Sequence, residues 1–207
     1  MNKQIRFMVD VAIFSGLGLV LDLFAEMYSA SIFPNGGSIG FAMACIFIIA
    51  FKHGIKGGLV GGFLIGIIQT LIATKAAGFN AITVFVQIAM DYWLAYTVVG
   101  FAGMFSSKFI NSQTNKEKNK YLILGISLGV LARLLVAGAA GWIFWVQYFP
   151  QEFLDQGTIG IIIYTFGYNA LYLIPSGILC AIVLIAVNVK IPKILAEEEC
   201  EKNIDIK

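Results

Sequence analysis

Charged residues are scarce in this sequence. Only 13% of its 207 residues are Asp, Glu, Lys or Arg, and 59% are hydrophobic, whereas ordinary soluble domains are about 25% charged and about 45–50% apolar. A soluble globular domain is therefore excluded. The formal net charge is only +2, and the basic residues are dispersed along the chain, which argues against a nucleic-acid partner.

Cysteine and histidine are also too few to build a reactive or metal-binding cluster. Cys45, Cys180 and Cys200 form no CxxC pair, so we expect neither a disulfide framework nor a metal site. The single histidine, His53, falls in an expected loop, where we expect it to be solvated and far from any nucleophile. An intramembrane hydrolase, which would need a nucleophile beside a base, is disfavoured. We therefore expect no enzymatic activity, no cofactor and no metal.

The apolar residues occur in long runs, which predict an all-α polytopic membrane protein. A membrane helix takes about 20 apolar residues, so six helices use roughly 120 positions and leave no room for a second folded domain. The chain 1–207 is thus expected to form one membrane domain. The expected helices cover about residues 7–28, 39–51, 55–74, 81–105, 121–146 and 159–189. We expect the second helix to be short or tilted and the lysine-rich stretch 106–120 to be a solvated loop.

The distribution of basic residues predicts the orientation in the membrane. With six spans, almost all lysines and arginines near helix ends fall on one side, and only Lys75 falls on the other. The positive-inside rule then places both termini in the cytoplasm. The loops 28–38, 74–80 and 147–158 are accordingly expected to face the outside of the cell membrane.

Small residues spaced four apart predict two close helix contacts. Gly58, Gly62 and Gly66 leave one face of the third helix nearly bare, and we expect another helix of this chain to pack there. Ala12 and Gly16 give the first helix a similar face. For that face, packing within the chain and docking of a partner helix are equally open.

The fifth helix carries an arginine on its longest ridge of small residues. The ridge consists of Gly125, Gly129, Arg133, Ala137, Gly141 and Trp145, each four residues after the last. An arginine at mid-membrane depth costs several kcal/mol unless it faces protein or water. We therefore expect Arg133 to point inward.

Polar and aromatic residues on three helices are expected to meet at one depth, in the outer half of the membrane. They are Gln87, Asp91 and Tyr92 on the fourth helix, Trp145 on the fifth, and Tyr164, Tyr168 and Asn169 on the sixth. A buried carboxylate beside aromatic rings suits a flat cation or an amino-substituted heteroaromatic ring. These residues predict a small-molecule pocket. For Asp91 a structural role as the partner of Arg133 is the alternative.

Several of these segments resemble the substrate-binding S components of energy-coupling factor (ECF) vitamin transporters, most closely the thiamine-specific family. The similarity covers nearly the whole chain. It is carried by residues 36–39 (GGSI), 52–62 (KHGIKGGLVGG), 91–92 (DY) and 141–148 (GWIFWVQY), and by Tyr164 followed by Asn169.

The resemblance implies a role for each matching residue. Asp91 stands where the family often has glutamate, Tyr92 matches its tyrosine, Trp145 its stacking tryptophan, and Tyr164 and Asn169 its ring-binding pair. Arg133 replaces a lysine at the pocket floor. Gly141, Gln87 and Tyr168 complete the expected ligand-binding set. Ala12 and Gly16 resemble the family's docking patch for a coupling protein, which favours a partner on that face.

Two departures affect the expected ligand. Ala137 stands where the family can carry a histidine, and Ser38 lies near a position where a tryptophan can stack on the thiazolium ring. Phe33, Tyr28 and Trp142 are alternative sources of that aromatic. The ligand is thus expected to be thiamine, with its pyrimidine precursor or another vitamin as alternatives.

The resemblance also implies partners. A transmembrane coupling protein and two cytoplasmic ATPase subunits are expected, since this chain has no G-x-x-x-x-G-K-[ST] loop with which to bind ATP. An autonomous proton-coupled secondary transporter, with Asp91 as the proton site, is one rival interpretation. A membrane chaperone or structural subunit, in which the polar cluster serves packing alone, is another.

Overall fold

The described residues are helical apart from the segments that connect the helices. The computed structural model describes residues 2–33, 36–73 and 80–196. No strand occurs among them, which confirms the all-α class. The α-helices are α1 (Lys3–Ser29), α2 (Ala42–Ala73), α3 (Ala81–Ile88), α4 (Ala95–Thr97), α5 (Ser106–Asn111), α6 (Asn115–Ala140), α7 (Gln151–Leu154) and α8 (Gly157–Lys190). The π- and 3-10-helical segments are η1 (Ala89–Leu94), η2 (Val98–Phe105), η3 (Gly141–Trp145), η4 (Val146–Tyr148) and η5 (Pro192–Ile194).

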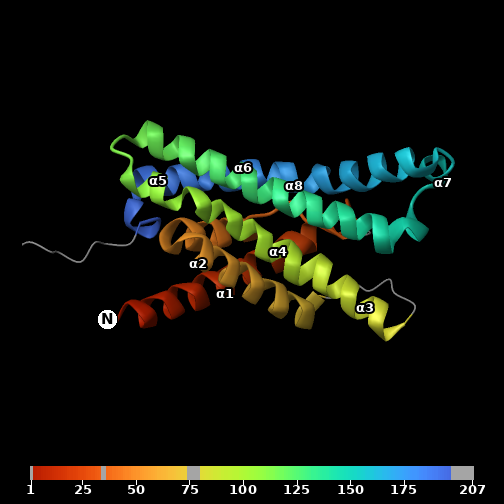
Figure 1. Ribbon diagram of the computed structural model, residues 1–207, viewed down its shortest axis with the longest axis horizontal. Helices are drawn as coiled ribbons and strands as arrows, with labels where there is room; N and C mark the ends of the chain where they lie inside the picture. The colour runs from red at the N-terminus through yellow and green to blue at the C-terminus, as the bar shows by residue number, and fades with distance from the viewer. Residues whose placement is uncertain (1, 34–35, 74–79, 197–207) are drawn as a thin grey trace, which may run out of the picture.

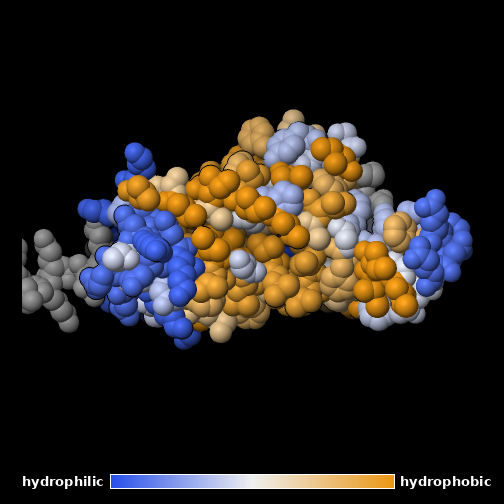
Figure 2. Space-filling model, turned by 90° about the horizontal axis from the view of Figure 1, so that it is seen from above, coloured by the Kyte–Doolittle hydropathy of each residue, from blue (hydrophilic) through white to orange (hydrophobic). Residues whose placement is uncertain are grey.

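The helices form an elongated bundle whose long elements lie roughly along its length (Figure 1). α1 begins and α8 ends at the end of the bundle that carries α5, and α7 lies at the other end. Five stretches are long and apolar enough to cross a membrane by length and composition: Lys3–Ser29, Ala42–Ile72, Ala81–Asn111, Asn115–Tyr148 and Gly157–Lys190. On the face seen in Figure 2 a broad hydrophobic belt separates two hydrophilic ends, as the surface of a protein that spans a bilayer requires.

The expected second and third helices are the two arms of α2, which meet at Gly54. This residue has φ +72° and ψ −170°, outside the helical region and in the range that favours glycine. The bend folds the second arm back along the first. The close packing of the two arms is seen at Gly61, where a Cβ atom would lie 2.7 Å from Cδ1 of Ile49. The first arm, 42–53, is only about 18 Å long at a 1.5 Å rise per residue.

The first arm of α2 forms the centre of the bundle. Residues 42–51 are all buried, and Ile46, Phe47, Ile49, Ala50 and Phe51 have no exposed surface. A helix that is hydrophobic all round is stable only when other helices surround it. This buried arm explains why the segment is short and carries no polar face.

The glycine stripe of the second arm packs within this chain, as predicted. A Cβ atom would lie 2.7 Å from Cα of Gly100 at Gly58, 2.3 Å from the carbonyl oxygen of Tyr96 at Gly62, and 2.6 Å from the Tyr92 carbonyl oxygen at Gly66. The backbones therefore touch where the segment from η1 to η2 crosses α2. Close contact of this kind needs glycine because any side chain would separate the two backbones.

The lysine-rich stretch 106–120 is mostly helical, so the expected long loop is wrong. α5 covers Ser106–Asn111 and α6 starts at Asn115. Thr114 caps α6 by accepting a 3.2 Å hydrogen bond from the Glu117 backbone N–H. A threonine followed three residues later by a glutamate is a sequence pattern typical of a helix N-terminus. The polar composition of this stretch therefore reflects helix ends that are exposed to solvent, and it does not indicate an irregular backbone.

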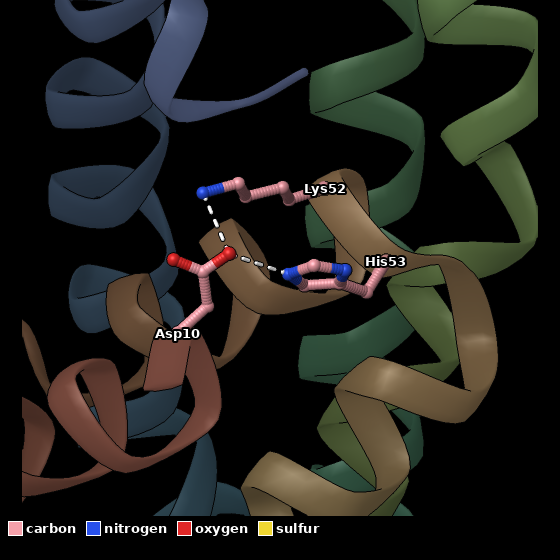
Figure 3. Close-up of polar contacts among 3 residues, drawn as sticks. All are labelled: Asp10, Lys52 and His53. Atoms are coloured by element: carbon pink, nitrogen blue, oxygen red, sulfur yellow. Dashed lines mark hydrogen bonds and ion pairs between the residues drawn. The ribbon is translucent and has the colours of Figure 1, made fainter. Parts of the chain in front are cut away.

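His53 is not solvated, which corrects the sequence-based expectation. Only 4% of its side chain is exposed, and its Nε2 lies 2.8 Å from Oδ2 of Asp10 on α1 (Figure 3). Lys52 Nζ lies 2.7 Å from the same oxygen. The Asp10 carboxylate thus connects α1 to the bend of α2. Its two partners, Lys52 and His53, follow it by 42 and 43 residues in the chain.

Candidate functional site

A cavity of about 280 Å³ lies between α1, the segment 36–38, the second arm of α2, η1, α6, η3 and α8. Eight of the nine residues expected to bind ligand line it: Asp91, Tyr92, Arg133, Gly141, Trp145, Tyr164, Tyr168 and Asn169. The ninth, Gln87, is fully buried behind Asp91 and is not part of the cavity wall. The spacing of these residues along their helices thus indicated which side chains line one cavity.

Two π-helical segments, η1 and η3, form adjoining parts of the cavity wall. Such segments frequently occur at functional sites because the extra residue per turn redirects side chains. η1 presents Asp91 and Tyr92, and η3 presents Gly141 and Trp145. The indole Nε1 of Trp145 donates a 2.9 Å hydrogen bond to Oδ2 of Asp91, so the two segments are joined at the cavity.

Asp91 is held by neutral donors. Gln87 Nε2 donates a 3.2 Å hydrogen bond to Oδ2 of Asp91, the oxygen that also accepts from Trp145. Among the described residues no ion pair joins Asp91 to Arg133, so the structural alternative for Asp91 is not supported. Because both bonds end on Oδ2, the second carboxylate oxygen is left for a ligand donor.

Arg133 points inward, as predicted, and its partly buried side chain lines the cavity. Its guanidinium lies 4.0 Å from the centroid of the Tyr96 ring, a cation–π contact. The Tyr96 hydroxyl donates to Oδ2 of Asp22, and Ser38 Oγ donates a 3.3 Å bond to Oδ1 of the same carboxylate. Tyr96 thus lies between Arg133 and the buried Asp22 of α1 and contacts both.

The α8 wall presents a row of tyrosines and one amide. Tyr164 and Tyr168 are stacked with centroids 5.9 Å apart. Asn169 donates a 2.8 Å bond to the Thr165 carbonyl and accepts from the Tyr172 hydroxyl, which fixes the orientation of its amide. These aromatic surfaces can stack on a flat ring, and the amide keeps one N–H for a directed contact.

Gly141 is required where α8 approaches η3. A Cβ atom at this position would lie 2.1 Å from Oγ1 of Thr165. Thr165 in turn donates a 3.2 Å bond to the Gly138 carbonyl. Gly141 therefore lets the two helices meet beside the cavity.

Several cavity residues were not in the set expected to bind ligand. They are Glu26, Ala30, Gly36, Gly37, Gln69, Ala95, Tyr96, Tyr148, Phe149, Thr165 and Tyr172. Of these, Glu26 carries a usable signal, because it follows Asp22 by four residues within an apolar helix, and intramembrane carboxylates are functional candidates by default. The same reasoning that selected Asp91 applied to this pair.

Phe33 and Ser38 both lie on the cavity wall. Of the three alternatives, Phe33 lines the cavity and makes edge contacts with Tyr168 and Tyr172 at centroid distances of 5.9 and 5.6 Å. Tyr28 and Trp142 do not line it, and they are 55% and 47% exposed. Ser38 and Ala137, the two departures, both lie on the wall.

Ala12 and Gly16 lie on a surface of α1 that no described part of the chain covers. Both are exposed, and a Cβ atom at Gly16 would meet nothing within 4 Å. The side chains of Ile13 and Leu17 beside them are also largely exposed. This small-residue face is therefore free for contact with lipid or with another helix.

Long apolar helices around a polar, aromatic-lined cavity define an integral membrane protein with a chamber of small-molecule size. The chain matches the family model described as "Thiamine transporter protein (Thia_YuaJ)" over residues 8–196. The chain belongs to this family, which confirms the resemblance found in its motifs. It is a transport protein rather than an enzyme. It is also a multi-pass protein of the cell membrane.

Two relatives and one solved structure agree with this assignment. The thiamine transporter ThiT of Bacillus subtilis (strain 168) is 31% identical over 201 residues, which cover 96% of this chain and 98% of the relative. ThiT of Lacticaseibacillus paracasei is 22% identical over 153 residues, covering 72% of this chain and 73% of the relative. A solved structure of ThiT from Listeria monocytogenes has the same fold, with a TM-score of 0.74, 22% identity, and coverage of 94% and 100% of the two chains.

Proposed function

We propose that this protein is the substrate-binding S component of an ECF importer and captures thiamine from outside the cell in the cavity described above. Membership of the thiamine transporter family supports the substrate. The cavity itself supplies the observation that carries the proposal. Two carboxylates (Asp91 and Glu26), two buried amides (Asn169 and Gln69) and the aromatic rings of Trp145 and several tyrosines surround a space of about 280 Å³, which suits a ligand made of two small aromatic rings.

Each polar group has a function in this proposal. The free oxygen of Asp91 accepts a hydrogen bond from the amino group of the pyrimidine ring, and Asn169 orients that ring. Trp145, Tyr164 and Tyr168 stack on the flat parts of the ligand, one of which is a thiazolium cation. Tyr92 and Gly141 shape the wall, and Gln87 keeps Asp91 in place. Arg133, which packs on the ring of Tyr96, closes the floor.

In the membrane, both termini lie in the cytoplasm and the chain makes six passes when the two arms of α2 are counted separately. The positive-inside rule supports this orientation. A transmembrane coupling protein docks on Ala12 and Gly16, and two cytoplasmic ATPase subunits supply the energy. The openness of the α1 face supports a partner helix there.

A ligand titration tests the substrate. The purified protein in detergent or nanodiscs is titrated with thiamine, its pyrimidine precursor and riboflavin while tryptophan fluorescence is recorded, because Trp145 lies on the cavity wall. We expect thiamine to bind most tightly and riboflavin not to bind. Tightest binding of the precursor would identify the pyrimidine alone as the cargo, and absence of binding by either would overturn the proposal.

A further inference from the structure

A buried amide on the α2 side of the cavity carries an unused hydrogen-bond acceptor. Gln69 lies on the cavity wall and is only 1% exposed. Its Oε1 atom is buried and accepts no hydrogen bond from the described residues. Buried polar atoms are almost always paired, and a ligand in the cavity that Gln69 lines is a source of the missing donor.

Glu26 sets the orientation of this amide. Gln69 Nε2 donates a 2.9 Å hydrogen bond to Oε1 of Glu26 on α1, and Glu26 also lines the cavity. A carboxylate can only accept hydrogen bonds, so it binds the NH₂ end of the amide and excludes the flipped arrangement. The carbonyl end of Gln69 is thereby kept as the free acceptor. Glu26 is a positioning residue for Gln69 in this arrangement.

We propose that Gln69, oriented by Glu26, forms a second polar subsite that accepts a hydrogen bond from the hydroxyl of the ligand's hydroxyethyl arm. This inference rests on the proposed function. Thiamine has two groups that donate hydrogen bonds, the amino group of the pyrimidine and this hydroxyl. Asp91 takes the first, and Gln69 on a different wall takes the second. The two subsites then fix both ends of the ligand.

A cycle of ligand and protein changes tests this pairing. The ligands are thiamine and an analogue in which ethyl replaces the hydroxyethyl arm, and the proteins are wild type and Gln69→Leu. Wild type is expected to bind the analogue about 5- to 10-fold more weakly, the effect of one neutral hydrogen bond to a buried acceptor. Gln69→Leu should bind thiamine about that much more weakly and should no longer distinguish the two ligands.

A second cycle and a matched control separate a direct contact from general damage. Oxythiamine lacks the amino group that Asp91 is proposed to bind. Because Asp91 and Gln69 lie on different walls, the loss of affinity caused by oxythiamine and the loss caused by Gln69→Leu should be additive. Asn188 offers the control, since it is 1% exposed and its side-chain amide donates to Asn119 outside the cavity. Its carbonyl oxygen is also buried and accepts no hydrogen bond within the described part of the chain. Asn188→Leu should leave the affinity for every ligand unchanged.

The outcomes also distinguish this inference from the proposed function. If wild type binds thiamine and the ethyl analogue equally well, or if Gln69→Leu retains the wild-type preference for the hydroxyl, the subsite is wrong although thiamine transport stands. If wild type binds no thiamine, the proposed function itself fails. Should Gln69→Leu not fold, Glu26→Gln provides the second test, because it removes the acceptor-only partner and should reduce the hydroxyl preference.

Discussion

The indole of Trp145 donates a 2.9 Å hydrogen bond to Oδ2 of Asp91. This bond joins η3 to η1, the two π-helical segments on the cavity wall. It fixes the indole plane and leaves the other carboxylate oxygen for a ligand. In the proposed function, stacking by Trp145 and hydrogen bonding by Asp91 are therefore coupled through this bond.

The first prediction separates the two contributions of this pair. Asp91→Asn removes the charge but keeps an oxygen for Trp145, and it should weaken thiamine binding by about 10- to 100-fold, as expected for a charge-assisted hydrogen bond. Trp145→Ala should abolish high-affinity binding, because it removes the stacking surface. Trp145→Phe keeps a ring and should lose less than Trp145→Ala. Titration calorimetry on folded variants measures each loss, and unchanged affinity in Asp91→Asn and Trp145→Ala would remove the pocket assignment.

The cavity wall shows what the sequence could and could not predict. Asp91, Arg133, Trp145 and Asn169 were predictable because polar side chains in long apolar helices must face protein or a cavity, and their spacing gives their face and depth. Gln69 was not, because its place on the wall depends on how α1 and α2 are rotated against the other helices. The same packing decides that Phe33, and not Tyr28 or Trp142, lies on the wall, a choice that the sequence left open. Rotation of one helix about its axis is decided by packing, which a single sequence does not encode locally.

The two corrections have different origins. His53 looked solvated because it precedes the Gly54 bend, and its partner Asp10 is 43 residues away. The stretch 106–120 looked irregular because lysine-rich composition was given more weight than the capping pattern that begins at Thr114. Composition reports exposure to water, whereas caps report where a helix begins.

The second prediction concerns the contact of Asp10 with Lys52 and His53. Asp10→Asn should lower the stability of the detergent-solubilised protein by about 1–3 kcal/mol, because it leaves a lysine with only 9% side-chain exposure without its countercharge. The melting temperature should fall accordingly. Asp155→Asn is the control, since Asp155 is exposed and accepts one bond from Gln151 at 2.9 Å. An equal effect of both substitutions would contradict a special contribution of Asp10.

The third prediction compares three glycines. Gly62→Ala places a Cβ atom 2.3 Å from the Tyr96 carbonyl oxygen, so the backbones must separate and stability should fall by about 1–3 kcal/mol. Gly54→Ala meets no atom within 4 Å but has a φ of +72° and a ψ of −170°, which should cost about 1–3 kcal/mol through backbone conformation alone. Gly16→Ala has neither problem and should be neutral or slightly stabilising. Thermal unfolding of the three variants gives the order, and tolerance of Gly62→Ala would refute the close contact between α2 and the segment from η1 to η2.

The fourth prediction separates binding from transport. Gly16→Leu adds a bulky side chain to the uncovered face of α1 and should leave thiamine affinity unchanged, because Gly16 does not line the cavity. Uptake by cells should be lost, since a coupling protein could no longer approach the helix closely. Gly167→Leu is the matched control: Gly167 is also an exposed helical glycine at which a Cβ atom would meet nothing within 4 Å, but it lies on α8. Normal uptake by Gly16→Leu, or equal loss in Gly167→Leu, would show that the partner does not dock on the Ala12 and Gly16 face.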